Sequence, residues 1–112
     1  MQLEDKKLHA LIHRKMMEQS PDSIFTFRVK LLRFFEKITG PIRGRVLDIG
    51  CGNGYASIYL AKHFPVDEVV ALEASISAVE ELIPRNIRHH GVEASCKAVV
   101  GSFEQIPYEQ YF

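Results

Sequence analysis

The amino-acid sequence has few cysteines, no excess of charge of either sign and no long apolar run. Its 112 residues carry 14 basic and 14 acidic side chains, which predicts no electrostatic footprint for nucleic acid. The N-terminus is charged, and no apolar run reaches the roughly 18 residues that a membrane span needs. We therefore expect a soluble, cytoplasmic protein that contacts no membrane. Cys51 and Cys96 are expected to be free thiols, since no secretory signal accompanies them.

Metal binding and an anionic partner have little support in the pattern of charged residues. The five histidines do not combine with the cysteines at metal-site spacing. His9 and His13 lie four residues apart on a predicted helix and could ligate a metal together, although a surface pair is the simpler interpretation. The first 40 residues hold eight Lys or Arg against five acids. This mild positive charge is typical of a solvated helical face, and contact with an anionic acceptor or RNA is the alternative.

Residues 1–40 predict an N-terminal helical segment of two helices. Apolar side chains recur at helical spacing over residues 3–19. Ser20-Pro21-Asp22 then combines an N-cap, a proline suited to the first turn and an acid that favours the helix dipole, which predicts a second helix ending at Gly40-Pro41. We expect a phenylalanine-rich stripe of this helix to pack on the following domain; the alternative is that the N-terminal helices also help to close a ligand site. The stripe comprises Ile24, Phe27, Leu31, Phe34 or Phe35, and Ile38.

Residues 41–112 alternate between strand and helix patterns in the order β-α-β-α-β. This order predicts an α/β fold with three parallel strands, right-handed crossovers and a ligand at the carboxyl ends of the strands. Pro84 predicts a kink or a break in the second helix of this domain, because proline removes a backbone hydrogen bond. The predicted strands span 46–49, 68–72 and 94–100, and the predicted helices span 55–63 and 75–90.

The most informative stretch joins the first of these strands to the helix after it. Three glycines, Gly50, Gly52 and Gly54, stand at alternate positions with Cys51 among them. Such glycines indicate positive φ angles and a ligand that approaches where any Cβ would clash. The dinucleotide fingerprint G-x-G-x-x-G is absent because Tyr55 stands at its last position, and no G-x-x-x-x-G-K-[ST] phosphate loop is present.

The pattern that remains is acid-x-Gly-x-Gly-x-Gly at the end of a buried strand. It resembles the first motif of the class I, Rossmann-like methyltransferases that use S-adenosylmethionine, and the resemblance extends from about Arg45 to the end of the chain. It implies S-adenosylmethionine as the cofactor, bound by the loop from Gly50 to Gly54. By the same resemblance, Asp48 helps to hold the amino-acid part of the cofactor and orders the loop; capping of the loop alone is the alternative.

The ends of the second and third strands supply the other candidate residues. Glu73 lies roughly 20 residues beyond the glycines, where an acid can accept hydrogen bonds from both ribose hydroxyls; a solvated surface Glu is the alternative. The resemblance implies that Ala74 lies against adenine, with Ser102 and Phe103 near it. Ser102 stands where the family often has an Asp, so its contact would lack a full charge. Phe103 is equally compatible with ordinary core packing.

The resemblance implies methyl transfer to an unidentified acceptor, which we expect to be a small molecule. No catalytic acid or base is assigned, because a sulfonium donor is already activated and alignment can supply much of the acceleration. Residues 108–112 look like the lead-in to a fourth strand, so we expect a truncated or partial methyltransferase. The first strand would then be an exposed sheet edge, which a homodimer would cover. A non-catalytic cofactor-binding or assembly module is the alternative, and Tyr55 disfavours an NAD-binding domain.

Overall fold

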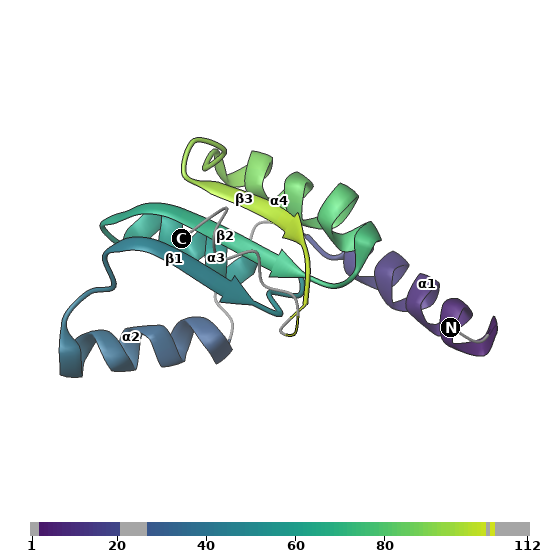
Figure 1. The fold of residues 1–112 in the computed structure, drawn as a ribbon, viewed down its shortest axis with the longest axis horizontal. Helices are drawn as coiled ribbons and strands as arrows, with labels where there is room; N and C mark the ends of the chain where they lie inside the picture. The colour runs from purple at the N-terminus through teal and green to yellow at the C-terminus, as the bar shows by residue number, and fades with distance from the viewer. Residues whose placement is uncertain (1–2, 21–26, 103, 105–112) are drawn as a thin grey trace.

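The structure is a computed structural model that describes residues 3–20, 27–102 and 104. Helices and strands follow in the order expected from the sequence, and Figure 1 shows their arrangement. The elements are α1 (Leu3–Glu18), α2 (Phe27–Thr39), β1 (Gly44–Ile49), α3 (Tyr55–His63), β2 (Val66–Glu73), the π-helix η1 (Ala78–Leu82), α4 (Ile83–His90) and β3 (Cys96–Val100).

The three strands form one parallel sheet in the order β1-β2-β3. Val46 lies beside Val69, and Val69 lies beside Cys96. Because all three strands run the same way, their carboxyl ends meet at one edge of the sheet, and α1 extends beyond that edge (Figure 1). The predicted α/β, Rossmann-like β-α-β-α-β portion with two helices before it is confirmed. None of the described helices is both long and apolar enough to cross a membrane.

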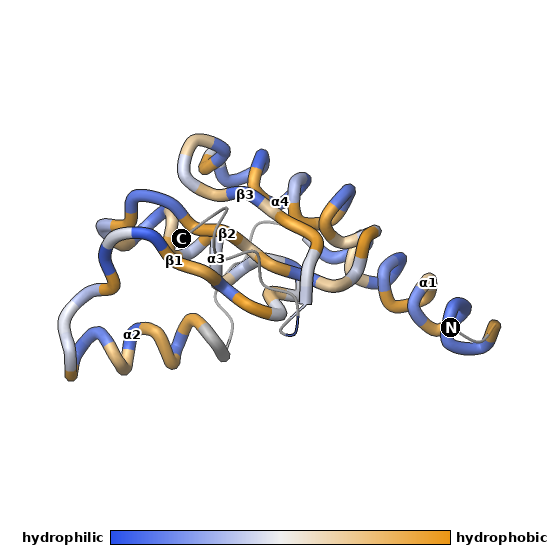
Figure 2. Tube along the Cα trace, viewed as in Figure 1, coloured by the Kyte–Doolittle hydropathy of each residue, from blue (hydrophilic) through white to orange (hydrophobic). Residues whose placement is uncertain are grey.

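The core lies between the sheet and the helices α3, η1 and α4, which cover one face of it (Figure 1). Val69 and Ala71 of β2 pack against fully buried side chains of these helices, such as Ile58 and Ile83. Hydrophobic residues concentrate along the strands, whereas polar and apolar residues alternate along the helices (Figure 2). Burial of each large aliphatic side chain contributes about 1.5–3 kcal/mol, so this layer holds the strand ends in place.

The orientation of α2 differs from the prediction. The stripe that was expected to pack on the sheet domain is largely exposed at Leu31, Phe34, Phe35 and Ile38. The side that faces the domain carries Val29, which is fully buried, with Leu32 and Arg33. The Nε–H of Arg33 donates to the hydroxyl of Tyr59 at 2.6 Å, and the guanidinium also lies over the Tyr59 and Phe64 rings. On this side of α2, contacts of a cation with aromatic rings thus add to the apolar packing of Val29 and Leu32. Ile24 of the predicted stripe lies outside the described residues.

The break expected at Pro84 is confirmed as a change of helix type. The N–H of Ile83 donates to the carbonyl of Ala78, five residues back, so η1 is wider than an α-helix. Pro84 follows at the start of α4, where its missing N–H costs least. The third strand begins at Cys96 rather than at residue 94, because Val92 and Ser95 close a turn before it.

Candidate cofactor-binding site

The glycine loop adopts the backbone conformation that its sequence predicts. Gly50, Gly52 and Gly54 have φ angles of +68°, +61° and +82°. At Gly54 an added Cβ would lie 2.9 Å from Cγ2 of Ile83, so this glycine is required for packing of the loop against α4. At Gly50 and Gly52 an added Cβ would meet nothing within 4 Å. The space in front of the first two glycines is therefore open on the side from which a ligand would come.

The loop is anchored on β2 through its backbone. The N–H groups of Gly50 and Cys51 both donate to the carbonyl of Leu72, at 2.8 and 3.2 Å. Gly54 then donates to the carbonyl of Cys51 at 2.9 Å, which closes the turn into α3. Cys51 is almost fully buried, so its side chain points into the protein. Only its backbone faces the open space in front of the loop.

Glu73 ends β2 beside this loop. One carboxylate oxygen accepts the N–H of Gly52 at 3.0 Å, and the other accepts the N–H of Ser75 at 2.9 Å. Hydrogen bonds from backbone N–H to a carboxylate are stronger than neutral ones. The two bonds fix the carboxylate and leave acceptor capacity on both oxygens, because an ionised carboxyl offers about four lone-pair sites. The end of β3 is tied to the same residue, since the N–H of Gly101 donates to the Glu73 carbonyl at 3.1 Å.

Asp48 lies on the sheet face that α3 covers. It is buried, and its carboxylate accepts a 2.6 Å hydrogen bond from the hydroxyl of Ser57, which is fully buried in α3. The interpretation of Asp48 as a residue that orders the loop agrees with this contact, because it ties the strand before the glycines to the helix after them. Burial, with the Asp48 charge as a smaller cause, raises the pKa of the Cys96 thiol to about 12. The Cys96 side chain is therefore an inert thiol below the site.

A hollow of about 200 Å³ lies next to Glu73 and the loop. Part of its wall is α1, so the N-terminal helix does help to enclose this part of the structure. It is lined by Gly52, Glu73, Ser75, Ala78 and Leu82, and from α1 by His9, Ile12, His13 and Met16. A second hollow, of about 280 Å³, lies between α2, β1 and α3 and has mostly apolar side chains around it.

The sequence-predicted residues are only partly brought together. The loop glycines and Glu73 meet at one place, and Asp48 supports the loop from within the fold. Ala74 is exposed next to Glu73, and Ser102 follows the end of β3, but neither lines the hollow. Phe103 lies outside the described residues.

His9 and His13 were interpreted as a surface pair, and the structure places both in the wall of the hollow. His13 is four-fifths buried, with its Nε2 3.0 Å from a carboxylate oxygen of Glu81 on η1. Their spacing of four residues was the available signal, because it puts both imidazoles on one helix face. Within residues 3–20, 27–102 and 104, no group of three or more His, Cys, Asp or Glu side chains is placed to hold a metal ion.

Comparisons with known proteins agree with this geometry. A protein from Methanococcus maripaludis that is assigned as an S-adenosyl-L-methionine-dependent methyltransferase has 28% identity and a TM-score of 0.62, over 69% of this chain and 34% of that chain. The YcgJ protein from Bacillus subtilis has 27% identity and a TM-score of 0.57, over 68% of this chain and 31% of that chain. TrmK of M. capricolum, solved in complex with S-adenosyl-homocysteine, has 16% identity, a TM-score of 0.59 and coverage of 71% and 33%, and it shows the fold alone.

The chain spans about a third of the length of these solved structures. The family model that matches it is described as a methyltransferase domain and aligns with residues 46–112, which is more than half of the chain. The aligned segment begins in β1 and includes the glycine loop, Glu73 and β3. The chain therefore belongs to the methyltransferase domain family.

Proposed function

We propose that this chain is the cofactor-binding part of an S-adenosylmethionine-dependent methyltransferase. The observation that carries the proposal is the Glu73 carboxylate, which the N–H groups of Gly52 and Ser75 hold at the carboxyl end of β2, on the rim of the hollow. A carboxylate at this place in a Rossmann-like fold is positioned to accept hydrogen bonds from both hydroxyls of a ribose. Family membership and the assigned function of the Methanococcus maripaludis protein support the proposal.

The other candidate residues take roles that follow from their positions. The backbone of the loop from Gly50 to Gly54 would lie against the amino-acid part of the cofactor, on the side where the first two glycines leave open space. Asp48 would keep the loop in this shape through its contact with Ser57. Ala74, Ser102 and Phe103 remain candidates for contacts with adenine.

When bound, the cofactor would supply a methyl group on a positively charged sulfur, which is already activated for in-line displacement. This chain would bind and orient it, and alignment with exclusion of water can supply much of the acceleration. The wall that α1 forms next to Glu73 would contribute to that exclusion. No catalytic acid or base is assigned in the described residues.

The proposed acceptor is a small molecule, and the proposed location is the cytoplasm. β1 has a neighbouring strand on one side only among the described strands. A homodimer through this edge is part of the proposal, and sedimentation velocity over a range of protein concentrations tests it. A monomer at every concentration would contradict it.

Titration calorimetry with S-adenosylhomocysteine tests the cofactor site, with NAD as the control ligand. Glu73→Gln replaces one acceptor oxygen by an NH₂ group, so it cannot accept from both N–H groups and a ribose as the carboxylate does. Loss of one charged hydrogen bond costs about 1.5–3 kcal/mol, which is roughly 10- to 100-fold in affinity. The matched control is Glu93→Gln, at an exposed position in the turn before β3.

The proposal expects binding of S-adenosylhomocysteine, no comparable binding of NAD, and weaker binding in Glu73→Gln but not in Glu93→Gln. Equal affinity of the two variants would contradict the role of Glu73. Failure of the wild-type chain to bind would contradict the cofactor site itself. Binding without methyl transfer to any acceptor would favour the non-catalytic module.

A further inference from the structure

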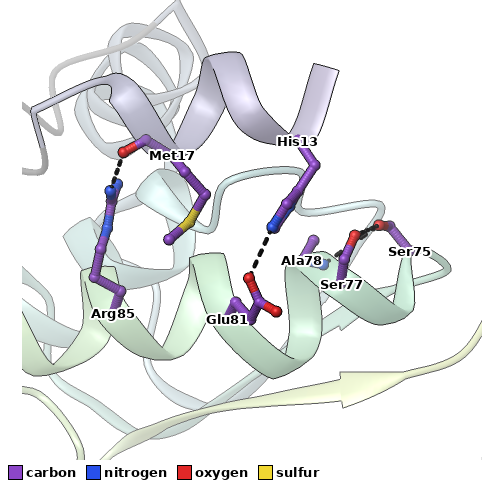
Figure 3. Close-up of polar contacts among 7 residues, drawn as sticks. All are labelled: His13, Met17, Ser75, Ser77, Ala78, Glu81 and Arg85. Carbon is purple, nitrogen blue, oxygen red and sulfur yellow. Dashed lines mark hydrogen bonds and ion pairs between the residues drawn. The ribbon is translucent and has the colours of Figure 1, made fainter. Parts of the chain in front are cut away.

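The carboxyl end of α1 is held by two side chains that follow the glycine loop in the sequence. The guanidinium of Arg85, on α4, donates to the carbonyl oxygens of Met17 and Gln19, the second at 3.3 Å; Figure 3 shows the first. The hydroxyl of Tyr55, at the start of α3, donates to the carbonyl of Ser20 at 3.2 Å. The last carbonyls of a helix lack partners within it, and a cation there is favoured by the helix dipole. These bonds fix the end of α1.

Asn86 joins Arg85 to the glycine loop. Its Oδ1 accepts hydrogen bonds from Nε and Nη2 of Arg85 at 3.1 and 2.9 Å, and its Nδ2 donates to the carbonyl of Asn53 at 3.0 Å. The two partners determine the orientation of the amide, because a guanidinium only donates and a carbonyl only accepts. Asn86 is fully buried, so a lost partner would not be replaced easily by water. A continuous hydrogen-bonded path thus runs from α1 through Arg85 and Asn86 to the loop; we call it the Arg85 relay.

The position of α1 depends on such contacts because its own packing is slight. None of its 16 residues is buried, although Met16 and Met17 pack partly against the core. One further contact lies along the helix, where His13 meets Glu81 of η1 at 3.0 Å (Figure 3). Helices in proteins gain most of their stability from tertiary packing. Among the described residues, few contacts therefore decide where α1 lies, and the Arg85 relay connects it to the loop.

The hollow beside α1 is small for a ligand site. Its volume of about 200 Å³ falls below the roughly 300–1,000 Å³ of typical small-molecule pockets. A ligand with a nucleoside part must therefore extend beyond the hollow or move α1 outward as it enters and leaves. A ligand that contacts both Gly52 and α1 stabilises the conformation in which α1 is docked beside the glycine loop.

We propose that Arg85 and Asn86 are positioning residues that couple the docking of α1 to the glycine loop, so that α1 closes over bound cofactor and slows its release. This inference rests on the proposed function, because it assumes that the ligand is the cofactor. On this proposal, Arg85 lengthens the residence time of the ligand without contacting the ligand.

Hydrogen exchange of α1 and the dissociation rate of S-adenosylhomocysteine test the inference together. In the wild-type chain the ligand should slow exchange over residues 8–19 at least tenfold. In Arg85→Met, exchange there should be faster without ligand, and the ligand should dissociate at least tenfold faster. Arg85→Lys, which keeps a cation near the α1 carbonyls, should restore part of both effects. Arg88→Met is the matched control, since it removes an exposed charge one turn further along α4 and should change neither readout.

Tyr55→Phe provides a milder variant that keeps the ring and removes only the hydroxyl contact to Ser20. It should change both readouts in the same direction, by at least twofold, even where Arg85→Met impairs folding. Wild-type binding with unchanged α1 exchange and unchanged dissociation in the variants would overturn this inference and leave the proposed function standing. Absence of wild-type binding would overturn both.

Discussion

Alanine at Gly52 and alanine at Gly54 should both destabilise the protein, but to different extents. Gly52 and Gly54 both have positive φ, so an L-residue at either position costs roughly 1–2 kcal/mol of backbone strain. At Gly54 the new Cβ would also lie 2.9 Å from Cγ2 of Ile83, whereas at Gly52 it would meet open space. Overpacking of a buried contact adds typically 1–3 kcal/mol. Gly52→Ala should therefore lower the free energy of unfolding by about 1–2 kcal/mol and Gly54→Ala by about 2–5 kcal/mol.

Urea denaturation followed by circular dichroism measures this difference. Ile83→Ala removes the atom that the new methyl group would meet, so in the double variant the cost of Gly54→Ala should fall toward that of Gly52→Ala. No such coupling is expected between Ile83→Ala and Gly52→Ala. Equal losses for the two single glycine variants, or no coupling at position 83, would refute the packing argument.

Ligand binding should show the reverse order. Gly52 lines the hollow and donates to Glu73, whereas Gly54 packs against α4. Gly52→Ala should therefore weaken binding of S-adenosylhomocysteine more than Gly54→Ala does, despite its smaller loss of stability. Calorimetry under conditions where both variants are folded makes this comparison. A stronger binding defect in Gly54→Ala would place the ligand elsewhere on the loop.

Three further outcomes follow from single side chains. Ser57→Ala removes a 2.6 Å bond to the buried Asp48 carboxylate and should cost about 1.5–3 kcal/mol of stability in urea denaturation; a loss below 0.5 kcal/mol, about the size of a surface substitution, would contradict this. Burial raises the pKa of Cys96 from 9.0 to about 12, so as the pH rises this thiol ionises first in the unfolded chain. The stability that is present below pH 9 should therefore fall between pH 9 and 12. The fall, relative to Cys96→Ala, should be about 1.4 kcal/mol per pH unit. An unchanged difference between the two proteins over that range would be inconsistent with a buried thiol. Burial, with nearby cations adding to it, lowers the pKa of His63 from 6.5, so the imidazole should titrate below that value by NMR. In Lys62→Met, which removes one of these cations, the pKa of His63 should rise.

The sheet and the glycine loop could be predicted from the sequence because their signals are local. A buried strand, alternate glycines and an acid at the next strand end each occupy a few consecutive residues, and the parallel crossover rule then brings them together. Glu73 was placed beside the loop by this reasoning, and its bond with Gly52 confirms that the two are neighbours. The role of either residue toward a ligand is still a prediction.

Other features depend on partners that are distant in the sequence. On the inward face of α2, Arg33 donates to Tyr59, a contact that hydrophobic periodicity does not predict. The path from α1 to the loop needs Arg85 and Asn86, neighbours in an ordinary helical segment with no motif around them. His13 lines the hollow because α1 lies at the carboxyl edge of the sheet (Figure 1), and no local sequence pattern predicts that position.

The most direct test of the cofactor site is an NMR titration of the isotopically labelled chain with S-adenosylhomocysteine. The amides of Gly52 and Ser75 donate to the Glu73 carboxylate, so their resonances report on any ligand that hydrogen-bonds to it. We predict saturable shifts of these two amides and of residues of α1, with no comparable change on addition of NAD. Binding that leaves both amides unchanged, or shifts confined to the hollow between α2 and β1, would contradict the proposed site.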